Sequence, residues 1–200
     1  MGTRDKQRYF NQLAAGWDAL PAVEGAPEKV RAFVRRAAGD ARSVLDVGCG
    51  TGLLLPALLE TYPDAVITEL DLAEEMLRAN VAKLALSRVR HVCADGARLP
   101  FADAAFDLVL CFGVLPHFED LYGALGELVR VLRTAGVLAI GHLMGSIELN
   151  AFHRSLDSPV AGDKLPAAAT LAGLLADLRL AVTAAEEAPD WYFVRGEKLR

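Results

Sequence analysis

The sequence of 200 residues contains no apolar run as long as the ~20 residues that a membrane-spanning helix requires. Its first ten residues are polar and charged, without the apolar core of a secretory signal peptide. The sequence therefore predicts a soluble, cytoplasmic protein that has no membrane partner.

Cysteine is scarce, and the three thiols, Cys49, Cys93 and Cys111, have neither an even number nor a zinc-type spacing. We interpret them as small buried side chains of a protein in a reducing compartment. No metal site is predicted; the alternative is a metal held jointly by His142 and His153.

Blocks of basic residues are also missing, since Arg35 and Arg36 form only a pair. The 26 acidic and 21 basic residues give a formal net charge of −5. Because nucleic acids bind concentrated positive charge, this balance disfavours a nucleic-acid partner. The sequence indicates no particular oligomeric state.

Short apolar segments alternate with segments of helical periodicity from residue 43 onward. This alternation predicts right-handed crossovers and an α/β fold, a Rossmann-like, mostly parallel, doubly wound sheet of seven strands. The expected strands are residues 43–47, 65–71, 89–93, 107–112, 137–140, 180–183 and 191–194. The expected helices are residues 5–18, 27–38, 53–61, 73–86, 120–132, 147–156 and 168–178.

Two details of this pattern are specific. In the helix at 73–86, we expect Met76, Leu77, Val81 and Leu84 to share one face. We also expect residues 135–136 to form the turn that ends the helix at 120–132.

Three glycines, Gly48, Gly50 and Gly52, follow the first strand and precede a helix. Glycines at such a turn let a ligand approach the bare backbone, and the helix N-terminus favours an anionic group. A dinucleotide fingerprint needs its third glycine where Leu53 stands. A nicotinamide-dependent oxidoreductase is therefore a minor alternative.

Acidic residues accompany this turn. Asp46 stands two residues before Gly48, where it repels a pyrophosphate and suits an ammonium group. Asp71 ends the second strand, about 20 residues on, where an acid can bind both ribose hydroxyls. Asp95 follows the third strand and can accept a hydrogen bond from the exocyclic amine of adenine. Together the positions predict a nucleoside that carries an amino acid.

Residues 44–52, VLDVGCGTG, resemble motif I of the class I S-adenosylmethionine (SAM)-dependent methyltransferases. Residues 9–18 resemble the N-terminal flap helix of the members that act on small molecules. Later motifs of the family are similar to residues 70–77, 95–101, 106–109 and 127–133. One departure is Thr134-Ala135-Gly136, where the family usually has Pro-Gly-Gly; we treat it as neutral.

The resemblance implies one methyltransferase domain over residues 1–200, with SAM as cofactor and S-adenosylhomocysteine (SAH) as product. Residues 1–40 correspond to a helical flap, 41–145 to the SAM-binding core, and 146–200 to the C-terminal helices and last two strands. The cofactor-binding positions it implies are Asp46, Gly48, Cys49, Gly50, Gly52, Asp71, Leu72, Met76, Asp95, Gly96 and Phe112, the last near the sulfonium.

The N-terminal segment carries Tyr9, Phe10 and Trp17. We expect it either to close over the cofactor as an aromatic lid, which makes Tyr9 and Trp17 cofactor contacts, or to pack on the edge of the domain.

Methyl transfer from a sulfonium is a direct displacement that needs alignment and exclusion of water, and a base only for a protonated acceptor. The candidate bases are His117 and His142, and the further possibilities are His153, Tyr122 and Tyr192. The segments expected to form the acceptor pocket, residues 13–25, 115–122 and 142–163, suit a mid-sized, partly apolar molecule.

The sequence thus predicts a SAM-dependent methyltransferase with a small-molecule acceptor. A protein or RNA methyltransferase and a non-catalytic SAM-binding protein remain as alternatives. Residues 111–114 read CFGV, so the Asn/Asp-Pro-Pro-Tyr signature of adenine and glutamine methyltransferases is missing.

Overall fold

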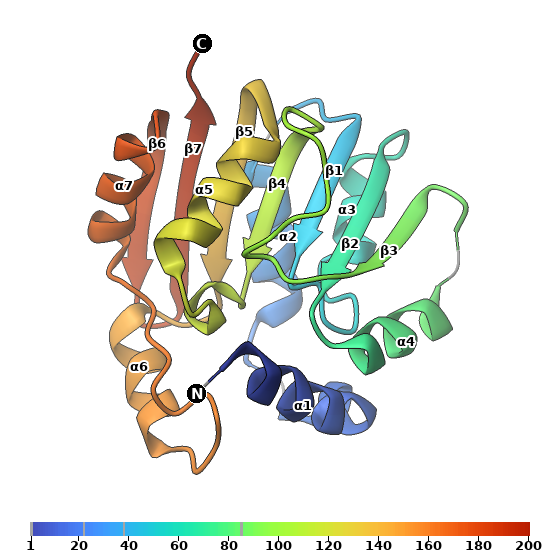
Figure 1. Ribbon diagram of the computed structural model, residues 1–200, viewed down its shortest axis with the longest axis vertical. Helices are drawn as coiled ribbons and strands as arrows, with labels where there is room; N and C mark the ends of the chain where they lie inside the picture. Colours follow the sequence, from blue (N-terminus) through green and yellow to red (C-terminus); the bar gives the residue numbers. More distant parts are fainter. Residues whose placement is uncertain (1, 22, 38, 85) are drawn as a thin grey trace.

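The computed structural model describes residues 2–21, 23–37, 39–84 and 86–200. They contain a seven-stranded sheet with the order β3-β2-β1-β4-β5-β7-β6 (Figure 1). β1 to β5 pair in parallel, and β7 lies antiparallel between β5 and β6. The strands are β1 (Ser43–Val47), β2 (Val66–Asp71), β3 (Val89–Cys93), β4 (Phe106–Phe112), β5 (Leu132–His142), β6 (Leu180–Ala188) and β7 (Trp191–Lys198). The predicted mostly parallel, doubly wound, Rossmann-like sheet is confirmed.

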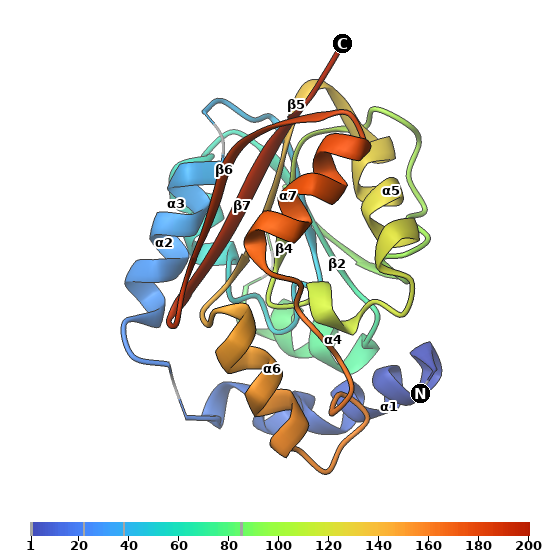
Figure 2. The same ribbon diagram turned by 90° about the vertical axis from the view of Figure 1, so that its left-hand side faces the viewer.

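Helices cover both faces of the sheet (Figure 2). α2 (Ala26–Ala37) and α3 (Leu55–Thr61) bury Phe33 and Leu58 against one face. α5 (Leu121–Val131) and α7 (Ala168–Asp177) bury Leu125 and Leu171 against the other. Because both faces are covered, β4 is buried over nearly its whole length, which explains its continuous apolar sequence.

The remaining helices gather at the carboxyl ends of the parallel strands (Figure 1). They are α1 (Thr3–Leu13), the 3₁₀ turn η1 (Ala14–Ala19), α4 (Glu74–Lys83), the 3₁₀ turn η2 (Leu115–His117) and α6 (Ser146–Ser155). Phe10 and Trp17 pack against Met76 of α4. The N-terminal segment therefore covers the edge of the sheet at which ligands of such folds bind.

The predicted apolar face of α4 is wrong in one position. Met76 and Leu77 are buried, but Val81 is 41 % exposed and Asn80 is 1 % exposed. Asn80 faces inward because its amide donates a hydrogen bond of 2.9 Å to the buried Glu69 on β2. A polar contact thus replaces the expected hydrophobic one.

The predicted turn at residues 135–136 is wrong as well. α5 passes directly into β5 at Leu132, and Ala135, with φ of 61°, lies within that strand. The pairing with β4 shifts between Phe106 and Leu108, so the extra residues form a bulge.

Element ends differ by a few residues elsewhere. β6 and β7 extend beyond their predicted ends, and the helix expected at 5–18 becomes 3₁₀ from Ala14. Ala38 and Ala85, which belong to two of the expected helices, lie outside the described residues. In the described part of the chain, no helix has the length and hydropathy that crossing a bilayer requires.

Candidate active site

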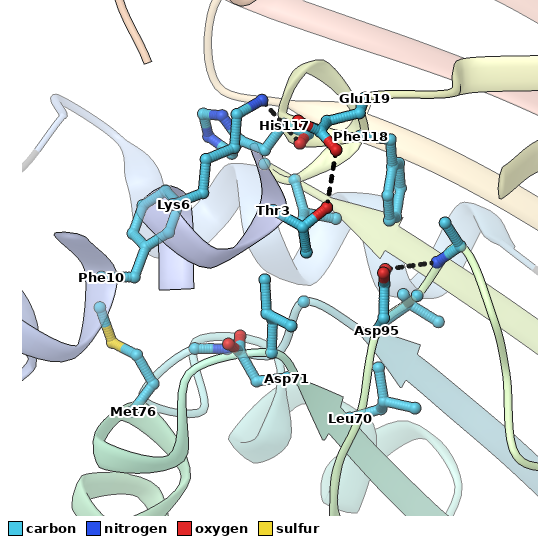
Figure 3. A pocket seen from close by; sticks show the side chains of 18 of the residues that line it. Thr3, Lys6, Phe10, Leu70, Asp71, Met76, Asp95, His117, Phe118 and Glu119 are labelled. Carbon is cyan, nitrogen blue, oxygen red and sulfur yellow. Dashed lines mark hydrogen bonds between the residues drawn. The ribbon is translucent and has the colours of Figure 1, made fainter. Parts of the chain in front are cut away.

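A cavity of about 270 Å³ lies between α1 and the carboxyl ends of β1, β2 and β3. Thr3, Lys6 and Phe10 of α1 form one side of it, opposite Asp71, Met76 and Asp95 (Figure 3). The predicted cofactor-binding residues that line this cavity are Trp17, Gly48, Gly50, Asp71, Leu72, Met76, Asp95 and Gly96. Residues from distant parts of the sequence thus meet in one place.

The glycine turn is held to β2 by its backbone. The N–H groups of Gly48 and Cys49 both donate to the carbonyl of Leu70, at 2.7 and 3.0 Å. Gly48 and Gly50 have φ of 73° and 55°, values that residues other than glycine rarely adopt. A Cβ on Gly50 would meet no atom within 4 Å, so the backbone there is open to a ligand.

Asp71 connects the glycine turn to the start of α4. Its Oδ2 accepts a hydrogen bond of 2.8 Å from the N–H of Gly50, and its Oδ1 accepts one of 2.8 Å from Ala73. Burial raises the pKa of this carboxyl above its ordinary value, although these backbone donors oppose the rise. A carboxylate has about four lone-pair sites, so Asp71 can also accept from the hydroxyl groups of a ligand.

The turn at Asp95 and Gly96 is closely packed. The Oδ1 of Asp95 accepts from the N–H of Ala97 at 2.9 Å, which fixes the turn after β3. A Cβ on Gly96 would stand 2.7 Å from Cε1 of Phe118 and 2.9 Å from Cγ1 of Val47. Only glycine fits at this position, and Phe118 and Val47 line the first cavity together with Gly96.

A second cavity, of about 280 Å³, adjoins the first. The two share five lining residues, namely Trp17, Gly48, Gly50, Gly113 and His117. Of the other predicted site residues, Asp46, Cys49, Phe112 and His142 line this second cavity and not the first. The ring of Phe112 packs on Phe33, with centroids 4.7 Å apart.

Asp46 lies beneath the glycine turn and is only 1 % exposed. Its Oδ2 is buried without a hydrogen-bond partner among the described residues. Burial, and then the charges of Glu69 and Asp71, raise the pKa of Asp46 well above its usual range. An unpartnered carboxyl oxygen in this position fits a ligand that brings an ammonium group to the glycine turn.

His117 stands at the junction of the cavities and is held by residues from other elements. Its Nδ1 lies 2.6 Å from Oδ2 of Asp163, and Nζ of Lys6 lies 2.6 Å from Oδ1 of the same carboxylate. Lys6 also donates to the carbonyl of His117 at 2.9 Å. Burial alone raises the pKa of Asp163, but the hydrogen bonds from His117 and Lys6 lower it overall.

The other two histidines of the second cavity are held by backbone groups. The Nδ1 of His142 accepts a hydrogen bond of 3.0 Å from the N–H of Met144. Burial, with His117 and His153 nearby, lowers the pKa of His142 to about 4. The Nδ1 of His153 lies 3.1 Å from the carbonyl of Asp163. Across the described ranges, no three His, Cys, Asp or Glu side chains are grouped to bind a metal.

Two predicted site residues lie outside both cavities. Tyr9 packs edge-on against Phe10, with centroids 5.4 Å apart, and Phe10 is the ring that lines the first cavity. Gly52 lies against α4, where a Cβ would stand 2.5 Å from Oδ1 of Asn80. Glycine at this position therefore permits close packing against α4.

Lys6 and Asp163 are the residues that sequence reasoning missed. Asp163 ends the segment expected to form the acceptor pocket, but nothing in the sequence pairs it with His117. Lys6 is a charged residue near the N-terminus, yet it is 5 % exposed. Neither position carries a local signal.

Known proteins resemble this chain in sequence. A family model described as "Methyltransferase domain" matches residues 45–140. A malonyl-[acyl-carrier protein] O-methyltransferase of Acetivibrio thermocellus is 31 % identical over 155 residues, which are 76 % of this chain and 53 % of that protein. A demethylmenaquinone methyltransferase of Roseiflexus castenholzii is 33 % identical over 137 residues, 66 % of this chain and 58 % of that protein. The chain thus spans little more than half the length of these curated relatives.

The fold also matches solved structures. The 1,6-didemethyltoxoflavin-N1-methyltransferase of Burkholderia thailandensis, solved with 1,6-didemethyltoxoflavin and SAH bound, has a TM-score of 0.75 and 20 % identity to this chain. The match covers 98 % of this chain and 88 % of that one. The sequence matches span the glycine turn and the acidic strand ends that line the first cavity. The chain therefore belongs to the class I SAM-dependent methyltransferases, a family of enzymes whose cofactor is S-adenosylmethionine.

Proposed function

We propose that this chain transfers the methyl group of SAM to a small-molecule acceptor. The observation that carries the proposal is the pair of adjoining cavities, which meet at the glycine turn and His117. Direct displacement needs two molecules that are bound side by side, with their reacting atoms at the junction of the cavities.

The first cavity suits the adenosyl part of the cofactor. Asp71 would accept from the ribose hydroxyls, and Asp95 with Gly96 would hold the adenine. Gly48 and Gly50 would lie along the methionine part, whose ammonium group the unpartnered Oδ2 of Asp46 suits. When bound, SAM supplies an activated methyl group on a sulfonium.

The chain contributes alignment and exclusion of water. α1 covers the first cavity, with Phe10 and Trp17 facing Met76. The acceptor atom forms its bond to the methyl carbon as the sulfur–carbon bond breaks, and the bonding pair stays on sulfur to give SAH. Such a reaction needs no metal and no covalent intermediate on the protein.

A small acceptor is supported by the second cavity and by the relatives. This cavity measures about 280 Å³, and part of it would hold the ammonium end of the methionine part at Asp46. The space that is left suits a small acceptor, since small-molecule sites typically measure roughly 300–1,000 Å³. Two of the relatives are named for methylating malonyl-[acyl-carrier protein] and demethylmenaquinone. The acidic net charge of −5 favours neither RNA nor DNA as the acceptor.

Calorimetric titration with SAM, SAH and, as control, NAD tests the cofactor. We expect micromolar binding of the two adenosyl ligands and none of NAD. SAH release in a screen of small metabolites then distinguishes an enzyme from a non-catalytic SAM-binding protein. Turnover only with a protein or RNA acceptor, or no binding of SAM and SAH, contradicts the proposal.

A further inference from the structure

The second cavity offers no cation to an acceptor. None of its described lining residues is Lys or Arg, and its one acidic residue is the buried Asp46. Burying an anion without a partner costs several kcal/mol. A carboxylate or phosphate on the acceptor therefore has no protein counter-charge in this cavity.

The rim of the same cavity is apolar. Val23, Leu53 and Phe152 line it and are nonetheless 39 %, 53 % and 49 % exposed. Exposed apolar side chains gathered at the mouth of a cavity mark a binding site for an apolar molecule. With Trp17 and Phe112 further inside, the lining suits a compact, planar scaffold.

His142 presents a hydrogen-bond donor. Because its Nδ1 accepts from the N–H of Met144, the proton of the neutral ring lies on Nε2. Burial lowers the pKa of His142 to about 4, so the ring stays neutral at physiological pH. His142 therefore donates from Nε2 and does not act as the base there.

His117 presents the complementary acceptor. Its Nδ1 faces the carboxylate of Asp163 at 2.6 Å, so the proton of the neutral ring lies on Nδ1 and the lone pair lies on Nε2. His117 also lines both cavities, whereas His142 lines only the second. Nε2 of His153 also carries a lone pair, since its Nδ1 faces the carbonyl of Asp163, but His153 lines only the second cavity. The lone pair that borders the cofactor therefore belongs to His117.

We infer that the methyl acceptor is a neutral, weakly acidic hydroxyl group on a compact apolar scaffold, recognised jointly by His117 and His142. This inference rests on the proposed function. A hydroxyl can donate its proton to Nε2 of His117 and accept a hydrogen bond from Nε2–H of His142. A carboxylate has no proton for His117, and an ammonium group has no lone pair for His142.

The transfer balances with these groups. The O–H bond breaks and its proton moves to Nε2 of His117, while Asp163 remains hydrogen-bonded to Nδ1. The oxygen lone pair forms the bond to the methyl carbon, and the sulfur–carbon bonding pair stays on sulfur. The products are a methyl ether and SAH, and His117 afterwards loses its proton to water.

Three probes that share one ring system test the inference, namely 2-naphthol, 2-naphthoate and 2-naphthylmethylamine. Each is titrated into SAH-saturated protein, and each is incubated with protein and SAM for mass spectrometry. We expect 2-naphthol to bind at least about tenfold more tightly than the others, because only it pairs with both rings. We also expect it alone to be methylated.

Variants assign the preference to residues. His142→Phe should remove most of the preference for 2-naphthol, since the donor is lost. His117→Gln should slow methylation about 100-fold or more, the usual contribution of a general base. The matched control is His91→Gln, because His91 lies on β3 outside both cavities; it should keep the preference and the rate.

Each further outcome overturns the inference. The hydroxyl acceptor is rejected if the protein prefers 2-naphthoate or the amine, or if it binds all three probes equally. It is also rejected if none of the probes binds while SAH does. The proposed function stands in each of these cases. Failure of SAH itself to bind rejects the proposed function, and the inference with it.

Discussion

His117 and Asp163 stand 46 positions apart in the chain and meet with a distance of 2.6 Å between Nδ1 and Oδ2. The first belongs to η2 after β4, and the second to the loop after α6. Lys6 of α1 contacts the same carboxylate at 2.6 Å. The orientation of His117 is therefore coupled to the position of the N-terminal helix that covers the first cavity.

Lys6→Met tests this coupling. The side chains of Lys6 and Asp163 are only 6 % and 10 % exposed, so loss of the ammonium group leaves a buried carboxylate with one partner fewer. We expect the free energy of unfolding, measured in urea, to fall by about 3 kcal/mol. Lys164→Met at the exposed neighbour of Asp163 is the control. Equal stability of the two variants would show that the ion pair contributes nothing.

Asp71→Asn tests the assignment of the ribose site. The amide keeps one oxygen for the backbone N–H of Gly50 or Ala73 but loses acceptor capacity toward a ligand. We expect SAH affinity in calorimetry to weaken by about 1–3 kcal/mol. Asp64→Asn, at an exposed acid before β2, should bind as the wild type does. Unchanged affinity of Asp71→Asn would remove this residue from the cofactor site.

Gly96→Ala tests the close packing beside Asp95. The added Cβ stands 2.7 Å from Cε1 of Phe118, so the ring of Phe118, which lines the first cavity, must shift. We expect weaker SAH binding, partly restored by Phe118→Leu in the same chain. Gly126→Ala is the matched control, because a Cβ there meets nothing within 4 Å in α5. It should leave binding unchanged and stabilise the fold by about 0.5–1 kcal/mol. Wild-type affinity of Gly96→Ala for SAH would show that the adenine binds elsewhere.

Glu69→Gln tests the buried carboxyl beside Asn80. Burial raises the pKa of Glu69 from 4.5 to about 7, although Asn80 and Lys83 oppose the rise. The folded state thus binds this proton more strongly than the unfolded chain does. The resulting stability is present below pH 4.5 and is lost as the pH rises to about 7. The loss is on the order of 3 kcal/mol, from 2.5 pKa units at about 1.36 kcal/mol each.

The measurement is the difference in unfolding free energy between wild type and variant from pH 4 to 8. Groups that do not interact with Glu69 titrate alike in both proteins and cancel in this difference. Asp46 does not cancel, because the charge of Glu69 raises its pKa, but the loss of that repulsion in the variant acts in the same direction. The difference should therefore grow in favour of Glu69→Gln as the pH rises. Glu60→Gln, at an exposed position on α3, should give a flat difference. A flat difference for Glu69→Gln too would mean that this carboxyl titrates normally.

Local sequence determined the parts of the site that depend on neighbouring residues. β1 occupies Ser43–Val47 as predicted, and the glycine turn follows it, because an apolar strand and a turn that needs positive φ leave short-range signals. Asp71 and Asp95 line one cavity because the carboxyl ends of adjacent parallel strands meet at one edge of the sheet.

Only the tertiary structure decided which neighbours face the cavities. Phe10 lines the first cavity and Tyr9 does not, because successive residues of a helix point in directions about 100° apart and packing sets the rotation. Asn80 is buried in place of Val81 because its partner, Glu69, lies on another strand. Lys6, His117 and Asp163 meet across as many as 157 positions. No local pattern encodes such contacts, since they arise only when the chain has folded over the edge of its sheet.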